Sequence, residues 1–245
     1  MLSDRPWKLE SVLMIAAGLL ASMSIGMMAA LALTKFGNLS ASDRTFYASV
    51  IGNLTFQGAA LVFAHRFLRQ HETTWHEFLG LHRRDLAVSI SRAILVALLA
   101  VPMALTLNAL SNEILTAIRS TPPDLQPAIQ TLQVSQTLGR RIFAGFSAIV
   151  LAPIAEEVLF RGILYATVKE LGRPRLALYG TSIVFAAIHG SWLTLAPLTF
   201  FALVLALLYE RTRSLLAPIV AHASFNAVNL VGFFWVRDVL HNGGS

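Results

Sequence analysis

The sequence contains no cysteine, and only 13% of its 245 residues are charged. The absence of cysteine excludes disulfide bonds, thiolate metal sites and a cysteine nucleophile. Soluble domains carry nearer a quarter of charged residues. The low charge content, the hydrophobic fraction of 56% and the mean hydropathy of +0.65 therefore indicate an integral membrane protein. Two catalytic patterns are also missing, the serine pattern Gly-x-Ser-x-Gly and the zinc pattern His-Glu-x-x-His.

The charges that are present give a formal net charge of +6. In a soluble protein this basic balance would suggest a nucleic-acid partner, but no basic patch is interleaved with aromatic residues as single-strand binding requires. Basic loops that hold the topology of a membrane protein against an anionic leaflet explain the charge better. We therefore expect membrane lipids, and no nucleic acid, among the partners.

Hydropathy predicts an all-α bundle of about seven membrane spans, with an eighth left open. Lipid allows the backbone only helices or closed barrels, and the period-2 pattern of a barrel is absent. The fifth and sixth spans are short for a bilayer, which needs about 20 residues of helix. We expect residues 1–245 to form one integral-membrane domain, without a cleavable signal at 1–8. The predicted spans are 12–34, 46–67, 86–110, 142–171, 176–189, 195–209 and 215–235.

The connecting segments differ in charge and in pattern. Lys and Arg favour the side of the N-terminus by about two to one, which predicts an inside N-terminus and an outside C-terminus. The segment 66–85 is either a short amphipathic helix on the inner surface or an ordinary loop. The segment 111–139 is predicted to be an outer loop that is partly helical over 128–138.

Three charged residues, Glu156, Glu157 and Arg161, interrupt the apolar run 142–168. A charge at membrane depth costs at least a few kcal/mol, so such residues mark function. Glu157 and Arg161 are four residues apart, share a helix face and can neutralise each other. Glu156 lies about 100° round the helix and gains no such partner from this segment. We expect Glu157 to be structural and Glu156 to be free for chemistry.

Two histidines lie in other apolar spans. His189 follows Phe185 by four residues and His222 precedes Asn226 by four, so each pair shares a helix face. Polar groups in hydrocarbon must face inward and find one another. A carboxylate in an apolar medium is a stronger base than in water. Glu156 with one histidine could then deprotonate water, while the other histidine and Asn226 donate to an oxyanion.

Two other classes of site remain open on these residues. Two histidines and a carboxylate make an acceptable zinc set, with Glu156, His189 and His222 as ligands, although the His-His pairing of zinc proteases is absent. We expect no cofactor and keep zinc as the alternative. A transporter with a proton relay through the same residues is the other alternative, but paired half-repeats are not evident in the sequence.

Three motifs, taken in order, resemble the CPBP family of intramembrane metalloproteases or glutamic endopeptidases. This family comprises the CAAX prenyl proteases of the Ras-converting type and the bacteriocin-processing or immunity proteins, also called the abortive-infection family. The three motifs, within 153–229, are Glu156-Glu157-x-x-x-Arg161, Phe185-x-x-x-His189 and His222-x-x-x-Asn226. Weaker matches are Trp75-x-x-x-Leu79-Gly80-Leu81, Gly172-Arg173-Pro174 and Arg213-Ser214-Leu215-x-Ala217-Pro218. The first half of the chain matches only in general character.

The resemblance implies an intramembrane endopeptidase of the glutamate type, which we expect in the bacterial inner membrane; the charge bias of the loops places its N-terminus in the cytoplasm. It implies a peptide or protein substrate, for which lipidation at the C-terminus is one option. Eukaryotic relatives have an extra span, and the family includes immunity proteins, so a non-catalytic immunity or scaffold role is the alternative function. The roles that it implies are water activation by Glu156 and His189, an oxyanion hole of His222 and Asn226, and support from Glu157 and Arg161.

Overall fold

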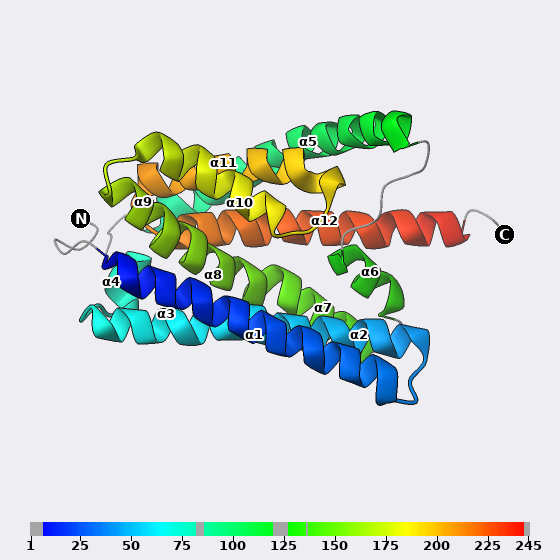
Figure 1. The fold of residues 1–245 in the computed structure, drawn as a ribbon. Coiled ribbons are helices and arrows are strands. Elements are labelled where there is room, and N and C mark those ends of the chain that lie inside the picture. Colours follow the sequence, from blue (N-terminus) through cyan, green and yellow to red (C-terminus); the bar gives the residue numbers. More distant parts are fainter. Residues whose placement is uncertain (1–6, 82–85, 120–126, 136, 243–245) are drawn as a thin grey trace.

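The computed structural model describes residues 7–81, 86–119, 127–135 and 137–242. Every regular element in these ranges is helical, and the long helices run side by side along one direction (Figure 1). The described chain starts at one end of the bundle and finishes at the opposite end (Figure 1). Most of the segment 1–8, where we expected no cleavable signal, lies outside the described residues.

Two of the long helices are built from α-helical pieces joined by π-helical segments, which are named η. The first half of the fold consists of α1 (Leu9–Phe36), α2 (Ala41–Asn53), η1 (Leu54–Gly58), α3 (Ala59–Gln70), α4 (Trp75–Leu79), α5 (Leu86–Arg119) and α6 (Pro127–Val134). The second half begins with α7 (Leu138–Phe146), η2 (Ser147–Leu151), α8 (Ala152–Glu157), η3 (Val158–Tyr165) and α9 (Ala166–Glu170). It ends with η4 (Leu176–Gly180), α10 (Thr181–Ala187), the 3₁₀ turn η5 (Trp192–Thr194), α11 (Leu195–Thr212) and α12 (Leu216–Asn242).

The all-α, multi-span architecture is confirmed. Six helices in the described residues are long and apolar enough to cross a membrane, and Leu176–Ala187 is a shorter apolar helix. This short helix ends two residues before the predicted limit and is only about 18 Å long, against about 30 Å for the hydrocarbon core. The sixth span was predicted to be short, and this was wrong, because the helix covers Trp192–Thr212.

The predicted outer loop 111–139 is largely helical. Helix α5 continues to Arg119, because the polar residues after 110 are compatible with a helix that leaves the hydrocarbon. The predicted helical part 128–138 corresponds to α6, which ends at Val134. A new helix, α7, then begins at Leu138, and the Thr137 hydroxyl accepts a hydrogen bond from Arg140 N at its start. This N-cap starts the spanning helix four residues before the predicted limit of 142.

The segment 66–85 contains a docked helix, which decides between the two alternatives in favour of a helix. Helix α4 starts with a capping box between Thr74 and Glu77 and ends at Gly80, whose φ is +71°. Leu79 O accepts hydrogen bonds from Ser214 Oγ at 2.9 Å and from Leu215 N at 3.2 Å. Two of the weaker sequence motifs therefore bind each other at the end of the bundle that holds the N-terminus (Figure 1).

Close packing in the bundle relies on small residues. Ala93, Ala97, Ala100 and Ala104 form one face of α5 and pack against α11 and α12. Such small residues let helix backbones approach in a membrane, where burial of apolar surface gives little driving force between helices. In contrast, α1 exposes many large apolar side chains, as expected for a surface that faces lipid.

Gly80 provides a test of the docked α4. A Cβ atom there would lie 3.0 Å from Ser214 Cα and 3.1 Å from Arg213 O, and the positive φ adds about 1–2 kcal/mol of backbone strain for an L-residue. Gly172 has a similar φ of +75° and no atom within 4 Å of such a Cβ. We expect Gly80→Ala to lower the melting temperature of the purified protein clearly more than Gly172→Ala. Equal losses would show that the contact with 213–214 contributes nothing.

Candidate active site

Three charged side chains lie inside the bundle on the helix that runs from Leu138 to Glu170. Glu156 and Glu157 are the last two residues of α8, and Arg161 lies in η3. The exposed fractions of Glu156, Glu157 and Arg161 are 7%, 0% and 2%. Burial of this kind is tolerated only where each charge finds a partner or performs a function.

Arg161 is neutralised as the spacing predicted. Its Nη1 donates to Glu157 Oε1 at 2.6 Å, and its Nη2 donates to Ala202 O on α11 at 3.0 Å. The guanidinium also lies over the ring of Phe185, 4.7 Å from the ring centroid. Arg161 thus connects α11 and α10 to the helix that carries both glutamates. Its positive charge is compensated by the carboxylate of Glu157.

Glu157 has a second partner, which the sequence analysis missed. His222 Nδ1 lies 2.9 Å from Glu157 Oε1. A carboxylate can only accept, so the imidazole donates its Nδ1–H. This contact fixes the ring orientation and directs the opposite nitrogen, Nε2, toward Glu156, with 3.9 Å between Nε2 and Glu156 Oε2. The pair joins residues 65 positions apart, so no local spacing could have signalled it.

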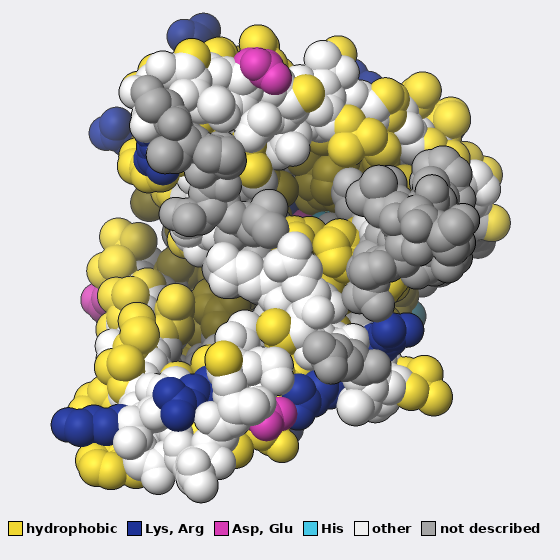
Figure 2. All heavy atoms as spheres, turned by 90° about the vertical axis from the view of Figure 1, so that its right-hand side faces the viewer, with side chains coloured by type: hydrophobic (Ala, Val, Ile, Leu, Met, Phe, Trp, Pro, Cys, Tyr) yellow, Lys and Arg dark blue, Asp and Glu magenta, His cyan; other side chains and the backbone are white. Residues whose placement is uncertain are grey.

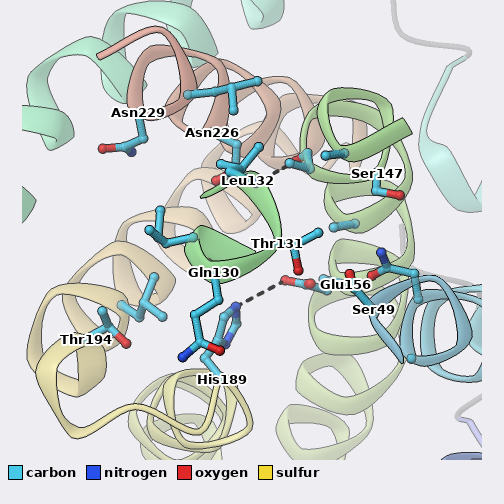
Figure 3. Close-up of a pocket in the computed structure, with 18 of the residues that line it drawn as sticks. Ser49, Gln130, Thr131, Leu132, Ser147, Glu156, His189, Thr194, Asn226 and Asn229 are labelled. Atoms are coloured by element: carbon cyan, nitrogen blue, oxygen red, sulfur yellow. Dashed lines mark hydrogen bonds and ion pairs between the residues drawn. The ribbon is translucent and has the colours of Figure 1, made fainter. Parts of the chain in front are cut away.

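His189 is oriented in the same way by a different acceptor. The helix α10 ends at Ala187, and His189 lies in the turn that follows, before Gly190 with φ +67°. Its Nδ1 lies 2.7 Å from Phe185 O, which can only accept. The Nε2 atom therefore faces Glu156 Oε2, again at 3.9 Å, and Figure 3 shows the two side chains directed at each other.

Asn226 contacts the backbone of the helix that carries Glu156. Its Nδ2 donates to Ala148 O at 2.8 Å. The Ala152 N–H bonds to Ser147 O in η2, and residue 153, the next donor along the helix, is a proline without an N–H. The Ala148 carbonyl consequently needs a hydrogen-bond donor from outside its own helix, and Asn226 Nδ2 is that donor. The carboxamide nitrogen keeps a second hydrogen for another bond.

The structure brings these side chains together around one cavity of about 1060 Å³. Glu156, His189, His222 and Asn226 all line it. Figure 2 views the end of the bundle that carries α6, and the surface there is hollowed between apolar side chains. Figure 3 shows α6 beside the cavity, to which it contributes Gln130, Thr131 and Leu132. Glu157 and Arg161 do not line the cavity in this structure and lie behind its wall.

The arrangement suits acid–base chemistry. Glu156 Oε2 is buried and has no hydrogen-bond partner among the described residues. It faces two imidazole nitrogens that are each 3.9 Å away, beyond hydrogen-bond distance but within reach of a bridging molecule. Within the described residues, no group of three or more His, Cys, Asp or Glu side chains has the arrangement of a metal site. The metal dependence of the site stays a prediction to be tested.

The fold and the site define a polytopic membrane protein in which a buried carboxylate faces two imidazoles at a cavity. Residues 139–228 match the sequence model of the Rce1-like family, described as type II CAAX prenyl endopeptidase Rce1-like. This segment contains all three motifs, so the resemblance inferred from them is confirmed over residues 139–228.

Two Bacillus subtilis (strain 168) proteins are similar to the chain over part of its length. "Uncharacterized protein YpbD" is 35% identical over 83 residues, covering 32% of this chain and 40% of the relative. "Putative membrane peptidase YdiL" is 31% identical over 77 residues, covering 31% of this chain and 32% of the relative. The chain thus matches less than half the length of either protein. No solved structure matches the chain.

Proposed function

We propose that the protein is an intramembrane endopeptidase of the glutamate type that hydrolyses a peptide bond with a water molecule activated by Glu156. One observation carries the proposal: a carboxylate oxygen of Glu156, without a hydrogen-bond partner among the described residues, faces Nε2 of both His189 and His222 at the cavity. The family match over 139–228 supports the same class of reaction.

The hydrogen bonds of the two histidines suggest how the proton moves. With Nδ1–H donated to Phe185 O, a neutral His189 presents the lone pair of Nε2 to a water beside Glu156. Glu156 takes a proton from that water, and the oxygen attacks the carbonyl carbon of the substrate. The proton then passes to the nitrogen of the leaving amine, so that one water is consumed for each peptide bond broken.

The second histidine and Asn226 are assigned to the oxyanion. For His222 to donate from Nε2 the ring must carry both protons, and the Glu157 carboxylate at Nδ1 supplies the counter-charge for that form. The second N–H of Asn226 gives another donor, held in place by the bond to Ala148 O. Donors fixed before the reaction stabilise the developing charge without reorganisation.

The proposed substrate is a peptide or protein segment within the membrane. Part of the cavity wall is apolar and includes Leu198 and Phe201 of α11 and Phe225 of α12. We propose that this wall takes an apolar group, which is either a side chain or a lipid on the C-terminus of the substrate. We propose the bacterial inner membrane as the location, and the charge bias of the loops supports an N-terminus in the cytoplasm.

The direct experiment is cleavage by the purified protein in lipid nanodiscs. Peptides of one sequence, with a free, a farnesylated or a geranylgeranylated C-terminal cysteine, are incubated with the wild type and with Glu156→Gln. We expect mass spectrometry to show cleavage at one internal bond by the wild type alone. Cleavage that is equal for both proteins would overturn the proposal, and no cleavage of any peptide would favour the immunity or scaffold role.

We further propose that the reaction needs no metal. Glu157 is committed to Arg161 and His222, and the Asn226 carboxamide is a poor zinc ligand but a good oxyanion donor. We expect elemental analysis of the active protein to give less than about 0.1 zinc per chain, and exhaustive chelation to leave cleavage unchanged. Stoichiometric zinc, with activity lost to a chelator and restored by the metal, would make Glu156, His189 and His222 ligands instead.

A further inference from the structure

Three side chains on the cavity wall keep a buried polar atom without a hydrogen-bond partner among the described residues. They are Glu156 with Oε2, Gln57 with Oε1 and Ser147 with Oγ. Gln57 and Ser147 are only 7% and 5% exposed. The proposed mechanism uses Glu156 and leaves the other two unexplained. A buried polar atom without a partner destabilises the fold, so its presence at a cavity calls for a ligand.

Ser147 differs from the other buried hydroxyl groups of the helices. Ser135, Thr167 and Ser182 each donate to the carbonyl oxygen four residues earlier, at 2.7 Å, and so find a partner within their own helix. Ser147 opens the π-helical segment η2 and makes no such bond. Its hydroxyl is therefore buried without a hydrogen-bond partner among the described residues, in a residue that lines the cavity.

Gln57 lies in the other π-helical segment of the cavity wall, η1. Such segments are frequent at functional sites. The extra residue in one helical turn rotates the side chains nearby to a different face of the helix. Segment η1 packs against α8, the piece of helix that ends with Glu156 and Glu157. The carboxamide of Gln57 therefore belongs to the same wall as the proposed catalytic carboxylate, and it approaches from a different span.

We propose that Gln57 and Ser147 bind the backbone of the substrate in an extended conformation, with Gln57 Oε1 accepting from a peptide N–H and the Ser147 hydroxyl donating to a peptide carbonyl. This inference rests on the proposed endopeptidase function. A peptide that is unwound so that one bond reaches Glu156 leaves its neighbouring backbone groups without partners, and in a membrane they must be satisfied. Main-chain hydrogen bonds to an extended peptide are a common source of affinity.

The position of Ser147 suggests where the backbone contact falls. It precedes Glu156 by nine residues, or about 13 Å along the helix, which is the length of about four residues of extended chain. Because backbone groups are alike for all residues except proline, contacts of this kind select an extended, proline-free segment rather than a particular sequence. Side-chain preference would then come from the apolar wall alone.

The test combines variants of the protein with esters in the substrate. The probe is the peptide that the wild type cleaves fastest, together with versions in which one backbone amide at a time is an ester and lacks the N–H. We expect Gln57→Leu and Ser147→Ala each to raise KM about three- to tenfold with little change in kcat. One ester position should raise KM by a similar factor for the wild type and have no effect on Gln57→Leu.

The control is Ser182→Ala, which removes a buried hydroxyl that bonds to Leu178 O outside the cavity, and it should leave KM unchanged. The ester series on the wild type keeps the inference falsifiable if Gln57→Leu fails to fold. Binding of the same peptide to Glu156→Gln, measured by fluorescence anisotropy with and without Gln57→Leu, separates this inference from the catalytic one. Ester effects that are identical with and without Gln57, or variants that change kcat alone, would overturn it.

Discussion

Replacing Glu156 by glutamine is expected to reduce kcat/KM by about 10²–10⁴-fold, which is the typical contribution of a general base. Glutamine keeps the shape of the side chain but cannot take a proton from water. Because Glu156 Oε2 has no hydrogen-bond partner among the described residues, the substitution breaks no bond that holds the fold. The melting temperature should therefore be equal to that of the wild type or higher, since a buried charge is removed.

The matched control is Glu210→Gln. Glu210 is also a glutamate on a spanning helix, and it is paired with Lys169 and Tyr165, away from the cavity. This variant should keep its peptidase activity, whatever it does to stability. Peptide cleavage by Glu156→Gln at a rate within a few-fold of the wild type would remove Glu156 from the mechanism.

Replacing Glu157 by glutamine is expected to damage the fold itself, with a loss of about 3–5 kcal/mol of stability. The buried guanidinium of Arg161 would lose its counter-charge, although its bond to Ala202 O would remain. His222 would lose the acceptor that fixes its ring. Thermal melting and expression yield in the membrane measure the first effect, and kcat measures the second.

A second substitution separates the two effects of Glu157→Gln. Adding Arg161→Met removes the stranded charge, so the double variant should regain much of the stability while its kcat stays low. A Glu157→Gln protein that melts like the wild type but is inactive, next to an active Glu156→Gln, would mean that the roles of the two glutamates are reversed.

The parts of the site that the sequence could predict are local. The pair of Glu157 and Arg161 follows from four-residue spacing on one helix. The contact of His189 with Phe185 has the same spacing, although it uses the backbone oxygen of Phe185 as well as the ring. The cost of polar groups in hydrocarbon also predicted that residues from separate spans would meet, and Glu156 does face both histidines.

The parts that could not be predicted depend on how one helix turns relative to another. The bond from His222 to Glu157 requires the rotation of α12 against α8, which periodicity does not encode. The π-helical segments η1 and η2 also change the face on which Gln57 and Ser147 lie, so an ideal helix misplaces them. A carboxamide within the apolar span 46–67 was the one available signal for Gln57.

In the proposed mechanism, Glu156 and His189, from two different helices, act on one water as a single catalytic unit. The most direct measurement is kcat/KM for Glu156→Gln, His189→Ala and the double variant on the same peptide, since residues that act as a unit are strongly non-additive. We expect the double variant to be no slower than the slower of the two single variants. Losses that multiply in the double variant would show independent roles and contradict the claim.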